Sequence, residues 1–284
     1  MAWTTLQSRR LETPGPLKSN AAICTVTRTP CTHQPQTSPL VDPKWIARGL
    51  TYLSMGNGLF WTKEQGWTCA VTITGGPRNK PHKYDISKGY GATDGSGTTD
   101  RLDGPPLVLA SGWRSIVSFS FANSQGGGTF GRILNPLGTL GNTANDEVIF
   151  ISGGTLLTKF FYRRNCSNAS GSHHIAGTPV LGVWKCYGVT HDQRTVGQTP
   201  ALYEDGTSAV VTLVDTSTGT FSRGPYTPSF GNRDSTRNWD GLHGPCMFFD
   251  HPTQGLTVDE HKTLYGNPWQ IFVPQTRAIW IPNV

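Results

Sequence analysis

The stretch Leu256-Thr-Val-Asp-Glu-His-Lys-Thr-Leu-Tyr-Gly-Asn-Pro-Trp-Gln-Ile-Phe-Val-Pro274 decides the fold. Thr257 and Glu260 have the spacing of a capping box, in which each residue satisfies a backbone N–H group at the start of a helix. Leu264 and Tyr265 give the helix an apolar side, and Gly-Asn-Pro at 266–268 ends it. The stretch therefore predicts one short helix, followed by an extended aromatic tail, docked on a larger body.

The composition predicts that this larger body consists of β-strands. The chain has 284 residues, with 34 glycines and 20 prolines, and only 15% of its residues are charged. Frequent Gly and Pro interrupt helices but are compatible with many short strands and turns. Nine Trp and twelve Phe residues provide large side chains for a core. We expect an all-β antiparallel sandwich.

Hydrophobic periodicity supports the same fold class. In Ile116–Phe121, Val117, Phe119 and Phe121 share one face and two serines the other, which indicates a half-buried strand. Turn signals at Gly153-Gly154 and Asp205-Gly206 predict two hairpins. The other expected strands are residues 147–152, 155–162, 201–204, 207–214, 246–249 and 278–281.

Four segments of the chain resemble segments of laminin-G-like (concanavalin-A-like) jelly-roll domains found in bacteriophage and prophage proteins, and they occur in the same order as in those domains. Those domains typically end in a short helix followed by Asn-Pro-Trp-Gln-Ile/Leu-Phe, as at 267–272 here. The other three similarities are the entry segment with Gln34-Pro35-Gln36, Asp42-Pro43 and Ala47-Arg48-Gly49-Leu50, the strand and hairpin of Gly182–Asp192 and Leu202–Gly206, and the returning segment Trp239-Asp240-Gly241. The resemblance implies a jelly-roll sandwich in a virion component.

We expect two parts along the chain. Residues 1–43 contain six prolines and no strand or helix period, which predicts an extended arm that docks on its own sandwich or on a neighbouring subunit. Residues 44–284 form the sandwich, with a long irregular loop at about 75–106. The candidate interface residues on the arm are Trp3, Leu6, Arg9, Arg10, Leu11 and Leu17.

Several classes of protein are disfavoured. The first twenty residues lack the apolar core of a secretory signal, and no run has the length of a membrane span. The six cysteines are scattered without a Cys-x-x-Cys pair, so buried free thiols are expected. The net charge is +6, but the basic residues are dispersed rather than clustered, which argues against nucleic-acid binding. We therefore expect neither a nucleic-acid partner nor a membrane partner.

We expect no catalytic site, cofactor or metal. Jelly-roll glycoside hydrolases of the laminarinase type carry Glu-x-Asp-x-Glu on one strand, and this chain does not. His173-His174 could begin a metal site, but adjacent histidines in a Ser/Gly-rich loop more often face solvent. Asp192, Asp205 and Asp240 are conceivable calcium ligands, although no Asp-x-Asp loop of the calcium type is present.

Aromatic side chains near predicted loops are candidates for stacking on a sugar ring. In a sandwich most large aromatic residues belong to the core, so each candidate has a packing alternative. The candidates are Trp61, Trp67, Tyr90, Trp113 and Tyr226.

Together these observations predict a structural component of a bacteriophage virion, either a head decoration protein or a tail-associated or fibre-associated protein. It would be made in the cytoplasm of the bacterial host, associate into oligomers and contact capsid, portal or tail subunits. The alternatives are a receptor-binding protein or lectin for a host surface glycan and, less favoured, an enzyme that cleaves glycans.

Overall fold

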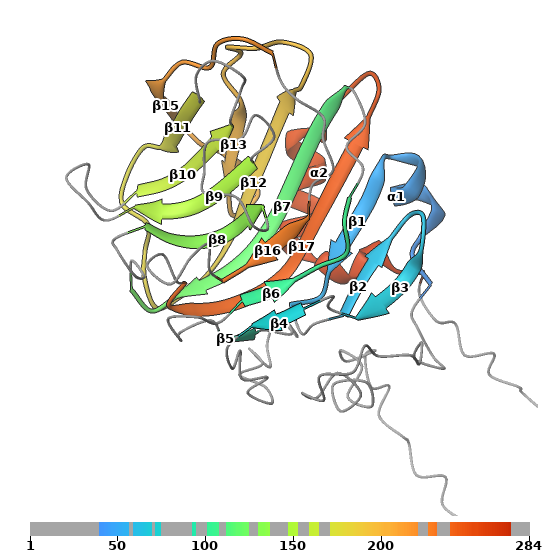
Figure 1. Cartoon of the computed structure of the whole chain (residues 1–284). Helices are drawn as coiled ribbons and strands as arrows, with labels where there is room; N and C mark the ends of the chain where they lie inside the picture. Colours follow the sequence, from blue (N-terminus) through green and yellow to red (C-terminus); the bar gives the residue numbers. More distant parts are fainter. Residues whose placement is uncertain are drawn as a thin grey trace, which may run out of the picture.

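A computed structural model describes residues 40–56, 59–69, 72–74, 93–94, 101–107, 112–124, 130–136, 147–152, 159–164, 171–220, 227–231 and 239–273. In these residues two antiparallel β-sheets lie face to face, and helices cover the outer face of one of them (Figure 1). The sheet with the helices is called the first sheet below, and the other is the second sheet.

The strands of both sheets are antiparallel throughout the described residues. The first sheet has the order β14 (Thr207–Ser208), β13 (Ala201–Glu204), β12 (Trp184–Asp192), β7 (Trp113–Ala122), β17 (Gly241–His251), β1 (Leu50–Ser54), β2 (Leu59–Thr62) and β3 (Gly66–Cys69), and β5 (Thr93–Asp94) also pairs with β17. The second sheet has the order β15 (Val211–Asp215), β11 (Gly171–Ile175), β10 (Lys159–Arg164), β9 (Glu147–Ser152), β8 (Phe130–Pro136), β16 (Pro228–Phe230), β6 (Arg101–Asp103) and β4 (Thr72–Thr74). The predicted all-β antiparallel jelly-roll sandwich with a short C-terminal helix is confirmed.

The first sheet has a hydrophobic cluster on each face. Successive side chains of a strand point to opposite faces, so Cys246 and Phe248 of β17 join the cluster between the sheets, while Met247 and Phe249 join the cluster beneath the helices. All four side chains are at most 2% exposed. Burying apolar side chains on both faces stabilises the sandwich and fixes the register of its central strands.

The expected half-buried strand at 116–121 is wrong in one respect, because β7 is buried on both faces. Val117 and Phe119 lie under the helices, but Ser118 and Ser120 on the opposite face are only 1% and 2% exposed. β7 pairs with β12 on one side and β17 on the other, at the centre of the first sheet. Serine therefore marks a tightly packed interior position here rather than a solvent face.

Three helical segments cover the outer face of the first sheet. They are α1 (Pro43–Ala47), α2 (Val258–Gly266) and the 3-10 helix η2 (Pro268–Ile271). The predicted capping box of Thr257 and Glu260 is present at the start of α2, which ends at Gly266 as expected. The helix α1 was not predicted from the sequence, although the Asp42 side chain caps it and a proline starts it. None of the helices in the described part of the chain has both the length and the apolar character that a membrane crossing requires.

The structure describes only parts of the predicted N-terminal arm, the predicted loop and the first predicted hairpin. Val41 forms an antiparallel bridge with Phe272, and residues 1–39 of the expected arm lie outside the described residues. Within the expected loop at 75–106, the structure describes β5, β6 and residues 104–106. β9 and β10 pair as predicted, but Ser152 lies opposite Lys159, so residues 153–158, which lie outside the described residues, connect them in place of a two-residue turn at Gly153-Gly154.

The predicted strand 207–214 is divided between the two sheets. Thr207–Ser208 pairs with β13 around the Asp205-Gly206 turn, whereas Val211–Asp215 pairs with β11 of the second sheet. The expected short strand at 246–249 belongs to the 11-residue β17, and 278–281 lies outside the described residues. At 209–210 the chain thus passes from the first sheet to the second. The alternation of apolar and polar residues continues through this crossing, so periodicity alone does not reveal it.

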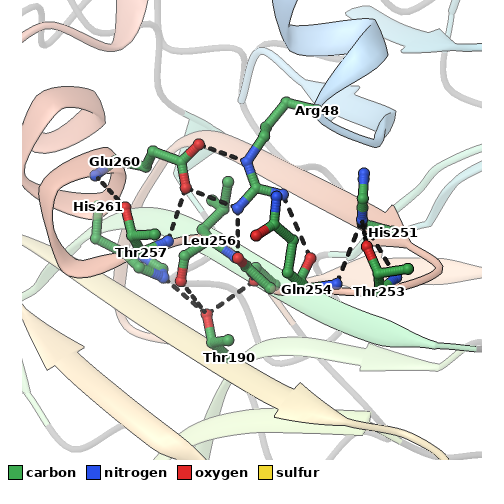
Figure 2. A network of polar contacts seen from close by, with 11 residues as sticks. Arg48, Thr190, His251, Thr253, Gln254, Leu256, Thr257, Glu260 and His261 are labelled. Atoms are coloured by element: carbon green, nitrogen blue, oxygen red, sulfur yellow. Dashed lines mark hydrogen bonds and ion pairs between the residues drawn. The ribbon is translucent and has the colours of Figure 1, made fainter.

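A polar network holds α2 against the first sheet (Figure 2). The guanidinium group of Arg48 donates to both carboxylate oxygens of Glu260, at 2.5 and 2.8 Å, and to the carbonyl oxygens of Gln254 and Gly255. Below the helix, the Thr190 hydroxyl lies 2.9 Å from Nε2 of His261 and 2.8 Å from Oγ of Ser115. Burial lowers the pKa of His261 to about 3, so its ring is neutral in this contact.

The same helix supports the hairpin formed by β13 and β14. The ring of His261 stacks on Tyr203 with centroids 3.9 Å apart, and it lies so close to Gly188 that a Cβ there would meet Nδ1 at 2.5 Å. The backbone at Gly206 likewise lies against Lys262 of the helix. The position of the hairpin is therefore fixed by α2.

We expect Thr190→Val to lower the free energy of unfolding by about 1–3 kcal/mol, because it leaves the buried polar groups of His261 and Ser115 without this hydroxyl. Urea unfolding measures the change. The matched control is Thr253→Val, at an exposed position where a change of about 0.5 kcal/mol or less is expected. Equal effects of the two substitutions would contradict the role given to Thr190.

One end of the interior between the sheets is polar. Nε of Arg114 donates to Oδ1 of Asp250 at 2.8 Å, and the two side chains are 0% and 2% exposed. Arg164 lies with its Nη1 atom 3.2 Å from Nδ1 of His191 and donates to the carbonyl oxygen of Asp192. His173, which is 3% exposed, belongs to the same region. Burial, together with the nearby charges of Arg164 and His191, lowers the pKa of its imidazole to about 4. We call this region the polar end; it contains Arg114, Asp250, Arg164, His191 and His173.

Candidate ligand-binding pocket

A pocket opens at the opposite end of the sandwich interior, at the corner where β10, β11, β12 and β13 meet. About 200 Å³ of space, open solvent included, lies between its walls, and the enclosed part is about 20 Å³, room for about one water molecule. We call it the corner pocket; its lining residues are Phe160, Ile175, Ala176, Gly177, Thr178, Pro179, Tyr187 and Glu204. Strands from both sheets and the segment 176–179 therefore contribute to it.

Two stacked rings form the apolar floor of the corner pocket. Tyr187 of β12 and Phe160 of β10 come from opposite sheets, and their ring centroids are 3.8 Å apart with an interplanar angle of 11°. Both residues are at most 2% exposed. Burial, together with the charges of Glu204 and Asp205, raises the pKa of the Tyr187 hydroxyl, which stays protonated. The floor is thus rigid and uncharged.

Glu204 is placed at the pocket by strand register. It is the direct partner of Tyr187 across β12 and β13, so the two side chains share the inward face of the first sheet. The Asp205-Gly206 turn that follows has positive φ at both residues, 51° and 74°, as a two-residue hairpin requires. This turn reverses the chain directly after Glu204, at the mouth of the pocket.

Lys185 links the two acidic residues of the hairpin. Its Nζ atom lies 3.0 Å from Oε1 of Glu204 and 2.8 Å from Oδ2 of Asp205. The backbone N–H of Cys186 donates to the other oxygen of Asp205 at 3.0 Å. Burial lowers the pKa of Lys185, but hydrogen bonds to Asp205 and Glu204 outweigh it and raise the pKa above its usual range. The mouth therefore carries two carboxylates and one ammonium group.

Hydrogen bonds also fix the segment 176–179 that forms the opposite wall. Nζ of Lys159 donates to the carbonyl oxygen of Gly177 at 2.8 Å, and the backbone N–H of Ala176 donates to the carbonyl oxygen of Val210 at 2.9 Å. Thr178 is exposed on this wall and Pro179 is buried. The corner pocket thus has a hydroxyl, a carboxylate and backbone groups around its opening, and these groups can form hydrogen bonds with the hydroxyl groups of a ligand.

The structure places the predicted sugar-stacking residues elsewhere. Trp61 and Trp67 are each 8% exposed and belong to the cluster under the helices, where Trp67 lies against Phe272 at 6.0 Å. Protein atoms therefore cover these two rings, which leaves little surface for a sugar. Trp113 is half-buried at the start of β7, at the polar end of the sandwich. Tyr90 and Tyr226 lie outside the described residues.

The arm residues predicted as an interface also lie outside the described residues; they are Trp3, Leu6, Arg9, Arg10, Leu11 and Leu17. Cys186 and Cys246 are buried and form no disulfide, as predicted. Burial raises the pKa of the Cys246 thiol to about 12, so this thiol is unreactive at neutral pH.

The predicted loop position of the two adjacent histidines is wrong, because both belong to strand β11. His173 points into the polar end of the interior, and the ring of His174 packs on the other side against Phe161 at 5.3 Å. Adjacent strand residues face opposite sides, so the two rings cannot share a ligand.

The three aspartates considered as calcium ligands are likewise separate. Asp192 accepts from Arg194, Asp205 from Lys185, and Asp240 from Asn123 and Ser124. Across the described residues, no three His, Cys, Asp or Glu side chains come together in a way that could hold a metal ion.

Sequence reasoning missed the corner pocket, although part of its signal was present. The strand containing Trp184 and the hairpin at Glu204 were both recognised, and period-two spacing along β12 puts Lys185 and Tyr187 on one face. Pairing these strands would have brought Lys185, Tyr187 and Glu204 together. Phe160 belongs to the other sheet, and its position depends on how the two sheets pack.

No model of a known protein family matches the sequence, and no curated protein matches it. Domain 4 of the extracellular arabinanase AbnA from Geobacillus stearothermophilus, solved in complex with arabinotriose, is similar with a TM-score of 0.50 and 14% identity, over 76% of this chain and 98% of that domain.

Two toxin structures are similar to the same degree. The botulinum neurotoxin serotype D/C binding domain gives a TM-score of 0.53 at 11% identity, over 78% of this chain and 52% of that chain. A structure concerning botulinum neurotoxin type C, whose cell entry depends on interaction with two ganglioside molecules, gives 0.52 at 13% identity, over 79% and 52%. The chain thus spans about half of each toxin structure. These similarities establish a concanavalin-A-like jelly-roll sandwich, and they give no support to a phage origin.

Proposed function

We propose that the sandwich is a carbohydrate-binding domain that contacts a glycan at the mouth of the corner pocket. The observation that carries the proposal is the Glu204 carboxylate, which lines the pocket and is held in place by Lys185. Carboxylates accept hydrogen bonds from sugar hydroxyl groups. Further support comes from the arabinotriose complex of a domain with the same fold.

The charge at the mouth favours neutral sugars over acidic ones. Glu204 and Asp205 carry two negative charges and Lys185 one positive charge, and all three side chains are between 17% and 31% exposed. An anionic sugar would meet a carboxylate in a partly desolvated site, where repulsion is stronger than in water. Arabinotriose and other neutral oligosaccharides are therefore the first probes, and a sialylated oligosaccharide is the matched acidic one.

We expect Glu204→Gln to weaken binding of the best neutral oligosaccharide by about tenfold or more, because a hydrogen bond to a charged group contributes about 1.5–3 kcal/mol. Asp205 still neutralises Lys185 in this variant, so the hairpin should remain in place. Isothermal titration calorimetry gives the dissociation constants. The control is Glu64→Gln, at an exposed turn position, which should leave the affinity unchanged. Equal affinities of the wild type and Glu204→Gln would count against the pocket as the site.

We further propose that the domain acts by binding rather than by cleavage, and that it is displayed on a phage particle. The support for the particle is the sequence resemblance to phage and prophage jelly-roll proteins, with the arm of residues 1–43 as the docking segment. A bound oligosaccharide should be recovered intact after incubation.

Mass spectrometry of purified particles tests the location: a high copy number indicates a head decoration protein, and a low copy number indicates a tail-associated or receptor-binding protein. The absence of the chain from particles would rule out the virion proposal but not glycan binding.

A further inference from the structure

The polar side chains of the corner pocket lie at different depths. Three of its lining residues have polar side chains, and these are Thr178, Glu204 and Tyr187. Thr178 is exposed, the Glu204 side chain is 31% exposed, and Tyr187 is only 2% exposed. Because burial increases in this order, Thr178 and Glu204 stand at the opening. The Tyr187 hydroxyl is therefore the innermost polar side-chain group of the pocket.

The Tyr187 hydroxyl has no hydrogen-bond partner among the described residues. Its ring stacks on Phe160, so packing fixes the position of the hydroxyl. The raised pKa keeps this hydroxyl protonated, and it can therefore donate a hydrogen bond. A buried hydroxyl without a partner costs free energy, and such groups in native proteins usually bind an ordered water or a ligand. The Tyr187 hydroxyl is thus available to a group that enters the pocket.

Glu204 supplies an acceptor beside this donor. Tyr187 and Glu204 are direct partners across β12 and β13, so their side chains leave the sheet next to each other on one face. The charge of Glu204 also acts on the pKa of the Tyr187 hydroxyl, which agrees with this proximity. A carboxylate has about four lone-pair positions, so Glu204 can accept further hydrogen bonds besides that of Lys185. A ligand hydroxyl can therefore accept from Tyr187 and donate to Glu204 at the same time.

Size limits which group of a glycan can reach the Tyr187 hydroxyl. The enclosed part of the corner pocket is about 20 Å³, room for about one water molecule. A hydroxyl oxygen has the size of a water oxygen, whereas a sugar ring or an acetyl group is larger. Among the hydroxyl groups of a hexose, the primary one projects furthest from the ring, because an exocyclic carbon carries it. It can enter the enclosed part while the ring stays at the opening.

We propose that the enclosed part of the corner pocket binds the hydroxymethyl group of a hexose unit, and that Tyr187 distinguishes this group from a methyl group. The inference rests on the proposed glycan site and adds its substrate class, hexoses with a free primary hydroxyl group. The Tyr187 hydroxyl donates to the primary hydroxyl, which in turn donates to Glu204. A 6-deoxyhexose has a methyl group at this position and leaves both protein groups without a partner, which is the basis of strong discrimination.

NMR titrations of the full chain with the methyl glycosides of galactose, glucose and mannose, each beside its 6-deoxy counterpart, test the proposal. At least one hexoside should bind, and its 6-deoxy counterpart should bind about tenfold more weakly or worse, because it loses a hydrogen bond to the charged Glu204 as well as one to Tyr187. Equal affinities within the binding pair, with binding still weakened by Glu204→Gln, would overturn this inference and leave the proposed glycan site in place. Absence of binding by all three hexosides would also overturn it, whereas failure of every oligosaccharide would overturn the glycan site itself.

Tyr187→Phe gives a second test, because it keeps the ring on Phe160 and removes only the hydroxyl. The urea midpoint of unfolding should not fall, since this hydroxyl bonds no other described residue. The variant should bind the hexoside about 2–10-fold more weakly and the 6-deoxy counterpart as the wild type does. Tyr162→Phe, a buried tyrosine at the polar end, is the control and should keep the wild-type ratio of the two affinities. An equal loss for both glycosides, or no loss for either, would overturn the proposal.

Discussion

Replacing Asp250 with asparagine is expected to lower the free energy of unfolding by about 3–5 kcal/mol, because it removes the carboxylate charge paired with the buried guanidinium group of Arg114. Arg114 is fully buried on β7 and Asp250 lies directly opposite it on β17. The 2.8 Å hydrogen bond between them joins two central strands of the first sheet. A typical domain is stable by only about 5–15 kcal/mol, so the variant should be severely destabilised.

Chemical denaturation compares this variant with Asp192→Asn. Asp192 also pairs with an arginine, but Arg194 is 49% exposed, and exposed ion pairs contribute about 0–1 kcal/mol. The two substitutions remove the same charge, so the comparison isolates the effect of burial. Similar losses at both positions would mean that the interior pair is solvated or otherwise compensated.

Acidification is expected to destabilise the protein strongly between pH 6.5 and 4. Burial, together with the charges of Arg164 and His191, lowers the pKa of His173 to about 4, and burial lowers the pKa of His261 to about 3. In the unfolded chain both imidazoles take up a proton near pH 6.5. Protons therefore favour the unfolded state, and the stability that is fully present above pH 6.5 is lost as the pH falls. Each histidine contributes a slope of up to about 1.4 kcal/mol per pH unit.

Unfolding free energies measured at intervals from pH 7 to pH 4 test this expectation. His173→Gln should remove about half of the slope, since one of the two buried imidazoles is gone while the other remains. His251→Gln, at a partly exposed position, is the matched control and should retain the slope. A stability that does not change from pH 7 to pH 4 would contradict the burial of neutral histidines in the folded state.

The features predicted best from sequence were those encoded by local chemistry. The capping box at Thr257 and Glu260 and the stop at Gly266 need only a few adjacent residues, and both were found at the expected positions. The Asp205-Gly206 turn is local in the same sense, because its positive φ angles suit these residue types. Such signals persist in the folded protein because tertiary contacts add to them rather than oppose them.

The features missed from sequence depend on which strands become neighbours. Ser118 and Ser120 have the polarity of a solvent face, yet the second sheet covers them because β7 is central. His173 was expected in a loop, although it is a buried strand residue. The corner pocket needs Phe160 and Tyr187, from different sheets, to stack at 3.8 Å, and no spacing along the chain encodes that contact.

The proposed function follows from the same geometry. α2 fixes the β13–β14 hairpin through Tyr203 and His261, and the hairpin fixes Glu204 at the mouth of the corner pocket. A polar group held in place before binding loses little conformational entropy when a ligand arrives. The helix that first indicated the fold thus also helps to position the residue on which the proposed glycan contact depends.

The most direct test of a glycan site in the corner pocket is an NMR titration of the isotope-labelled full chain with a panel of neutral oligosaccharides. The account predicts saturable shifts of the backbone amides at 176–179, Tyr187 and Glu204, with the polar end of the sandwich at Arg114 and His173 unaffected. Saturable shifts confined to another surface, or no shifts with any neutral oligosaccharide at millimolar concentration, would contradict it.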